Sequence, residues 1–129
     1  MEASTKRFRK REAILACLRA TDIHPGAEWV YARLKPQIPD LSLGTVYRNL
    51  ALFKEQGLIQ SVGRVGGVER FDGETHPHVH FICENCASVI DLMELEIPES
   101  LSREAGNASG GRVNACSLTF YGTCENCLV

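Results

Sequence analysis

Two Cys-x-x-Cys motifs constrain this chain of 129 residues more than any other feature. They lie at Cys83–Cys86 and Cys124–Cys127, with residues 87–123 between them. A two-residue gap lets one turn present two thiolates to one ion, and four thiolates form a closed tetrahedral zinc shell. The motifs therefore predict a structural zinc site that joins two distant segments and leaves no open position for catalysis.

Reduced thiols and two disulfides are the alternatives for these cysteines. The charged segment 1–11 has no apolar stretch behind it, so no secretory signal is visible and we expect a cytoplasmic protein. Disulfides are rare in that compartment, which favours metal binding. The apolar runs are far shorter than the roughly 18 residues that cross a bilayer, so we expect no membrane association.

The residues before the motifs have the apolar spacing of helices, followed by short strands. The expected helices cover residues 11–20, 27–34 and 43–56. Ser42 is suited to cap the third helix, and Gly57 is suited to end it. The strand candidates that follow are 58–62 and 68–71. Three helices followed by a hairpin is the order of a winged helix-turn-helix.

The rest of the chain is patterned as a small mixed domain after a hinge at 73–75. We expect strands at 79–82 and 88–93, a helix at 98–105, a loop at 106–111 and a last strand at 112–121. The expected fold class is therefore α+β. It comprises an N-terminal winged-helix domain over 1–72 and a small α/β metal-binding domain over 73–129.

The formal net charge of −2 conceals an asymmetry between the two halves. Residues 1–62 carry ten Lys or Arg and six Asp or Glu, a net of +4, and residues 63–129 carry four and ten, a net of −6. A basic half joined to an acidic half indicates that only the first half meets a polyanion. An uneven distribution of solvated charge is the alternative.

The third expected helix carries the residues best suited to read DNA. Val46 and Leu50 belong to its apolar stripe, so the polar residues beside them face outward. These candidates are Thr45, Tyr47, Arg48 and Asn49. Arg48 can pair with a guanine and Asn49 with an adenine in the major groove. The alternative is a solvated, charged helix face.

A second candidate metal site lies in the segment 76–80, His-Pro-His-Val-His. On a strand, His78 and His80 point to one face. Asp72 precedes them and Asp91 ends the next expected strand. Nitrogen and oxygen donors without a thiolate suit iron or manganese. A surface cluster of histidines is the alternative.

Three segments together carry a family resemblance: 45–50 (TVYRNL), 78–86 (HVHFICENC) and 121–127 (YGTCENC). They resemble the ferric uptake regulator family of bacterial metal-dependent repressors, and the match spans nearly the whole chain. The resemblance implies a homodimer that binds palindromic operator DNA, with 1–72 as its DNA-binding domain and 73–129 as its metal-binding dimerisation domain. We therefore expect a cytoplasmic repressor and not an enzyme. It also implies structural Zn²⁺ with Fe²⁺ or Mn²⁺ as the regulatory metal.

Within the family, the chain looks most like the peroxide-sensing repressors, whose regulatory metal has three His and two Asp ligands. The resemblance carries these roles to His24, Asp72, His78, His80 and Asp91. Iron-uptake members usually have Glu at the positions of the two aspartates. The resemblance implies that His24 or His78 is oxidised when peroxide meets bound iron, and that peroxide is the only small-molecule signal.

The chain departs from the family pattern at the start of the first helix. Phe8-Arg9 stands where the family has Thr-Pro, which also weakens the assignment of Lys6 to the minor groove of DNA. Cys116 lies where histidines are common. We expect it, like Cys17, to be a small core residue, with a free thiol near the metal as the alternative.

Three rival functions are compatible with these residues. An iron-uptake or zinc-uptake repressor would share the scaffold and differ in its signal. A small metalloenzyme is disfavoured, because three His and two Asp leave at most one open position on the ion. A thiol redox switch built on the two motifs is the third rival.

Overall fold

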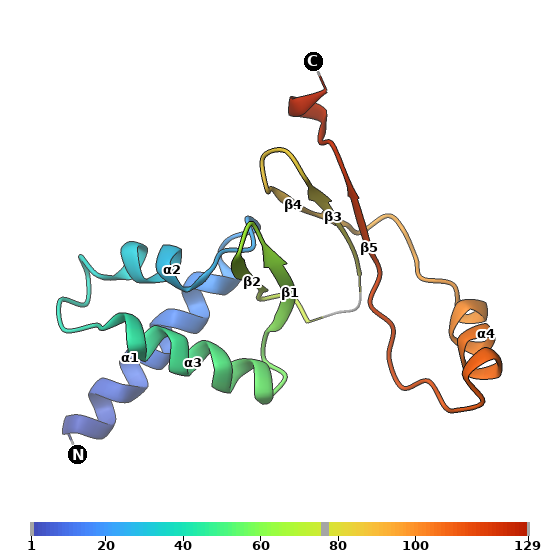
Figure 1. The fold of residues 1–129 in the computed structure, drawn as a ribbon. Helices are drawn as coiled ribbons and strands as arrows, with labels where there is room; N and C mark the ends of the chain where they lie inside the picture. The colour runs from blue at the N-terminus through green and yellow to red at the C-terminus, as the bar shows by residue number, and fades with distance from the viewer. Residues whose placement is uncertain (1, 76–77, 129) are drawn as a thin grey trace. The chain divides into compact units, whose positions relative to one another are not determined.

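The computed structural model describes residues 2–75 and 78–128, which form two compact units (Figure 1). Unit 1 comprises Met1–Thr75 and unit 2 comprises His76–Val129. The boundary lies after Thr75, and the roles assigned to 1–72 and 73–129 stay predictions. His76 and Pro77, part of the expected histidine cluster, lie outside the described residues.

Unit 1 has the element order of a winged helix. Its elements are α1 (Glu2–Arg19), α2 (Ala27–Leu34), α3 (Leu43–Glu55), β1 (Gln60–Val65) and β2 (Val68–Asp72). The expected bounds of α2 and α3 agree with these to within a residue. Ser42 caps α3 as expected, because its Oγ accepts a hydrogen bond of 3.1 Å from the N–H of Thr45.

The expectation for α1 was wrong, because the helix begins at Glu2 and not near residue 11. Lys, Arg, Ala and Glu dominate residues 2–13, and these residues propagate a helix readily when no proline interrupts them. The basic residues of this segment therefore lie on a helix.

The core of unit 1 lies where the inner faces of its helices meet the hairpin. Phe53, Ile14, Val30 and Val46 are completely buried there. The strands pair antiparallel across a turn at Gly66 and Gly67, both with positive φ, which fits a tight hairpin with right-handed twist. The second strand of the hairpin thus ends with Asp72 beside His24, in the loop before α2.

Unit 2 is a small sheet with one helix. Its elements are β3 (Val79–Cys83), β4 (Val89–Leu92), α4 (Glu99–Ser109), β5 (Thr119–Gly122) and the 3₁₀ turn η1 (Glu125–Cys127). The strand order is β4-β3-β5, with β3 antiparallel to β4 and parallel to β5. These elements, with those of unit 1, confirm the α+β class.

Two element bounds in unit 2 differ from expectation. α4 continues through 106–109, which was expected to be a loop, and stops at Gly110, whose φ of 73° forms a left-handed cap. The last strand is only Thr119–Gly122, and 112–118 has no regular structure. β5 pairs only with His80–Cys83, so the strand starts at Thr119, where its pairing with β3 begins.

Across the described parts of the chain, no helix is long and apolar enough to cross a membrane.

Candidate metal centres and nucleic-acid interface

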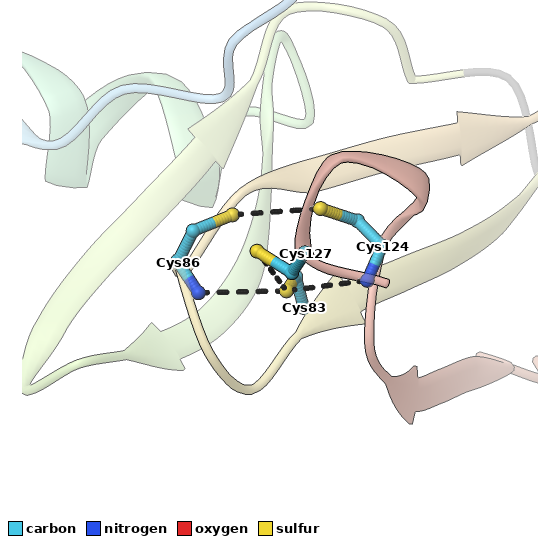
Figure 2. Close-up of side chains that lie close together, drawn as sticks. All are labelled: Cys83, Cys86, Cys124 and Cys127. Carbon is cyan, nitrogen blue, oxygen red and sulfur yellow. Dashed lines mark hydrogen bonds between the residues drawn. The ribbon is translucent and has the colours of Figure 1, made fainter. Parts of the chain in front are cut away.

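The four motif cysteines of unit 2 meet at one end of its sheet (Figure 2). Cys83 ends β3, and its register partner on the parallel strand β5 is Gly122, which lies two residues before the second motif. The parallel pairing therefore places both turns side by side. All four Sγ atoms lie within 4.8 Å of one another.

The sulfur spacing fits a single tetrahedral ion. The Cys83 and Cys127 Sγ atoms are 3.9 Å apart, and those of Cys86 and Cys124 are 3.7 Å apart. A tetrahedral shell with metal–sulfur bonds of about 2.3 Å places its sulfurs about 3.8 Å apart. All six cysteines of the chain are free thiols here, so the disulfide alternative finds no support.

Backbone amides prepare this cluster for a cation. The N–H groups of Cys124 and Cys86 donate to Cys83 Sγ at 3.3 and 3.4 Å, and these bonds lower the pKa of Cys83 to about 6. A hydrogen bond from Asn85 lowers the pKa of Cys127, but the neighbouring thiols and burial outweigh it and raise that pKa to about 11. Binding of a metal at this site would therefore release protons.

Unit 1 contributes a buried histidine–carboxylate pair. His24 lies in the loop before α2 and Asp72 ends β2, with His24 Nε2 and Asp72 Oδ2 3.2 Å apart. The residues are only 2% and 7% exposed. The other oxygen of Asp72, Oδ1, accepts a hydrogen bond of 2.8 Å from the N–H of Glu74. This pair offers one imidazole and one carboxylate to a cation.

Unit 2 contributes a second donor group. His78 and His80 are buried, and both Nε2 atoms approach Asp91 Oδ1, at 2.9 and 3.2 Å. The antiparallel register pairs His80 with Asp91, and strand alternation places His78 on the same face as His80. The two rings lie 4.4 Å apart. This burial contradicts the alternative of a surface histidine cluster.

The expected DNA-reading residues have different degrees of exposure on α3. Arg48 and Tyr47 are exposed, whereas Thr45 and Asn49 are half-buried. Arg48 Nη2 donates to Thr45 Oγ1 at 3.1 Å, and Asn49 Nδ2 donates to the Thr45 carbonyl at 2.9 Å. Lys6 is exposed on α1.

A groove of about 640 Å³ runs between α1 and α3 within unit 1. It is lined by Arg7, Phe8, Lys10, Arg11, Thr45, Arg48, Asn49 and Leu52. The guanidinium and ammonium groups make this surface suitable for phosphate contacts.

The two cysteines outside the motifs differ. Cys17 packs against the core of unit 1 as expected, and burial raises its pKa against a lowering effect of Arg33. Cys116 is exposed, so the expectation that it is a core residue was wrong. It lies in 112–118, which the short pairing of β5 leaves outside the sheet.

Sequence reasoning missed Arg70, whose side chain donates to the backbone of the His24 loop. An arginine in an alternating strand is typical of a solvent face, so the local pattern carried no signal for this contact.

A winged-helix unit followed by a unit with thiolate and imidazole–carboxylate donors defines the class of metal-responsive DNA-binding regulators. The profile of the ferric uptake regulator family matches residues 2–121. The chain belongs to this family, whose members are transcriptional regulators.

Relatives and solved structures agree with this assignment. The chain is 34% identical to the peroxide-responsive repressor PerR of Staphylococcus aureus (strain USA300) over 118 residues, which are 92% of this chain and 79% of the relative. It resembles the structure of the Campylobacter jejuni peroxide stress regulator with a TM-score of 0.80 at 27% identity, covering 98% of this chain and 94% of that one. The Vibrio cholerae ferric uptake regulator gives a TM-score of 0.69 at 28% identity, covering 88% of each chain.

Proposed function

We propose that this protein is a homodimeric, metal-dependent repressor that binds palindromic operator DNA and senses peroxide. The single observation that carries the proposal is the donor set of three histidines and two aspartates, each in close contact with another donor of its own unit. The similarity to a peroxide-responsive repressor supports the choice of signal.

The regulatory metal, Fe²⁺ or Mn²⁺, would be held by His24 and Asp72 of unit 1 together with His78, His80 and Asp91 of unit 2. Imidazole and carboxylate donors suit both ions. An ion bound by both units stabilises only the arrangement that brings their donors together. At a free concentration of a hundred times its Kd, it favours that arrangement by about 2.7 kcal/mol.

The structural metal would be Zn²⁺ at Cys83, Cys86, Cys124 and Cys127. The sulfur spacing and the lowered pKa of Cys83 support this assignment. Because a shell of four thiolates leaves no open position, its role is to stabilise unit 2.

A second copy of the chain would cover the apolar surface of unit 2. α4 has no buried residue, and Leu101, Phe120 and Tyr121 are 39%, 46% and 65% exposed. Large exposed apolar side chains on one unit are typical of an oligomer interface. A two-fold dimer would present two copies of α3 to successive major grooves of a palindrome, about 34 Å apart.

In each winged helix, Thr45, Tyr47, Arg48 and Asn49 would face the major groove. Arg48 would give up its hydrogen bond to Thr45 and donate to a guanine instead. Asn49 reaches an adenine only by releasing the Thr45 carbonyl. Lys6, exposed on α1, would reach the minor groove.

Peroxide would end repression through the histidine ligands. Bound Fe²⁺ would supply the redox chemistry that turns peroxide into an oxidant beside its ligands. His24 or His78 would then gain an oxygen atom and lose donor quality, so the two units would no longer share the ion. The DNA-binding arrangement would lose its stabilisation.

The test begins with a duplex selected from a random library by the Mn²⁺-loaded protein. Fluorescence anisotropy then measures binding of this duplex with Mn²⁺ and with Fe²⁺, before and after peroxide under anaerobic handling. We expect both forms to bind and only the Fe²⁺ form to be released. Peptide mass spectrometry should find one added oxygen on His24 or His78 in that form alone.

An iron-uptake repressor is the second candidate, favoured by the solved ferric uptake regulator structures that share the fold. If the Fe²⁺-loaded protein shows no histidine oxidation and stays bound to DNA after peroxide, this candidate is supported instead.

A further inference from the structure

The loop that carries His24 lies along strand β2 within unit 1. The N–H of Phe71 donates to the Pro25 carbonyl at 3.0 Å. A Cβ atom at Gly26 would come within 2.6 Å of Val68 Cγ1, so the loop and the strand are in close contact there. The backbone around His24 is therefore attached to β2 on its C-terminal side.

Arg70 attaches the same loop on its N-terminal side. Its Nε donates to the carbonyl of His24, and its Nη2 donates to the carbonyl of Ile23 at 2.8 Å. One planar guanidinium thus spans two consecutive carbonyl groups. A lysine ammonium is a point charge on a flexible stem and does not reproduce this fork.

Strand geometry places Arg70 beside Asp72. Residues two apart in a strand point to the same face, so both side chains of β2 face the His24 loop. Arg70 binds the backbone of His24, while Asp72 contacts its imidazole. The strand therefore holds this residue at both ends.

The backbone of His24 requires such support. Its φ of 56° lies in the left-handed region, which residues with a side chain adopt infrequently. A strained backbone persists where surrounding contacts determine it. Arg70 donates to the carbonyl of His24 itself and to that of the residue before it, Ile23.

We propose that Arg70 is a positioning residue that holds His24 in the conformation required of a metal ligand. This inference rests on the proposed function, because it takes His24 as a ligand. Arg70 itself does not touch the ion. Removing a residue that orients a metal ligand typically lowers metal affinity by about 10–100-fold.

The test compares Arg70→Gln and Arg70→Lys with the unmodified, zinc-loaded protein. Arg64→Gln is the matched control, because Arg64 lies on the same hairpin and also donates to a backbone carbonyl, that of Gly67 at 2.9 Å. Isothermal titration calorimetry with Mn²⁺ measures the regulatory site. Amide hydrogen exchange without Mn²⁺ measures protection of the Phe71 N–H.

We expect Arg70→Gln to weaken Mn²⁺ binding about tenfold or more and to speed exchange at Phe71. Arg70→Lys should recover only part of the affinity, and Arg64→Gln should change neither reading. If Arg70 had a purely structural role, Arg70→Gln would lower the unfolding midpoint in urea and leave the Mn²⁺ affinity of the folded protein unchanged. That result would overturn the inference.

The two proposals fail in different ways. If the unmodified protein binds no Mn²⁺, the proposed regulatory site is wrong. If it binds Mn²⁺ tightly and Arg70→Gln binds equally well, only the positioning role of Arg70 is wrong. Unchanged exchange at Phe71 in Arg70→Gln would also contradict that role.

Discussion

At the scale of single residues, Ala87 is in a backbone conformation that its side chain disfavours. Its φ is 63°, and it follows directly after the first Cys-x-x-Cys motif. Its N–H donates to the Cys83 carbonyl at 2.9 Å, which closes the turn that presents both thiols. A left-handed residue with a Cβ costs about 1–2 kcal/mol.

Ala87→Gly should therefore stabilise the zinc-loaded protein. The relief of the Cβ clash exceeds the extra chain entropy that glycine loses on folding, so we expect a net gain of about 0.5–1 kcal/mol. Urea unfolding measures this change. Ala105→Gly, within the helix α4, is the control and should instead lose about 1 kcal/mol. A loss in both variants would contradict the assigned strain.

Arg48→Ala should weaken specific DNA binding by about 1–3 kcal/mol and leave the fold intact, because Arg48 is exposed beside the buried Val46 and Leu50. Fluorescence anisotropy on the selected duplex and on a scrambled duplex measures the effect. An equal loss on both duplexes would indicate a phosphate contact in place of base recognition.

Asp91→Glu tests whether this aspartate controls the response to peroxide. Asp91 Oδ1 approaches both His78 and His80, and an added methylene would move the carboxylate relative to both rings. We expect this variant to bind Mn²⁺ and the selected duplex but to show less oxygen addition on His24 or His78 when the Fe²⁺ form meets peroxide. Peptide mass spectrometry reads the oxidation. Oxidation equal to that of the unmodified protein would show that the aspartate does not tune the response.

At the scale of elements, α3 depends on its first turn. Ser42 Oγ accepts from the N–H of Thr45, and it also lies 2.8 Å from Thr45 Oγ1. The cap thus orients the turn that carries the expected base contacts.

Ser42→Ala should destabilise unit 1 by about 1 kcal/mol, since one N–H of the first turn loses its acceptor. Urea unfolding followed by the fluorescence of Trp29 in α2 reports on this unit. Ser42→Asp keeps an acceptor and should retain the stability. If alanine and aspartate behave alike, the cap contributes nothing measurable.

At the scale of the whole molecule, the two units differ in what stabilises them. The core of unit 1 includes eleven buried hydrophobic residues. Among the described residues of unit 2, the buried apolar ones are Val79, Ile82, Cys83, Val89 and Cys124, of which two belong to the thiol cluster. A unit with so small a core depends on a cross-link or a partner.

Cys83→Ser should therefore unfold unit 2, with loss of zinc and of the dimer. Metal binding contributes folding free energy where the apolar core is small. Zinc analysis and gel filtration measure the outcome, and unit 1 should keep its helical circular dichroism. Cys116→Ser is the control and should remain a zinc-loaded dimer. A folded, zinc-free dimer of Cys83→Ser would contradict the structural role.

Much of the fold could be predicted because its signals are local. The stripe of Val46, Leu50 and Phe53 repeats with the helical period, and Ser42 and Gly57 mark the ends of α3. The start of α1 could not be predicted in the same way, since residues 2–10 are mostly polar and have no apolar period. The length of β5 depends on its partner β3 and not on its own residues.

The sequence by itself determined the chemistry of this protein: which donors it has, that their spacing suits metal ions, and which family it belongs to. These properties depend on residue type and on neighbours a few positions away. Only the tertiary structure decided that parallel pairing brings the two thiol turns together, that Cys116 is exposed, and that Arg70 holds the His24 loop. Contacts between residues far apart in the chain exist only after folding, so no local pattern encodes them.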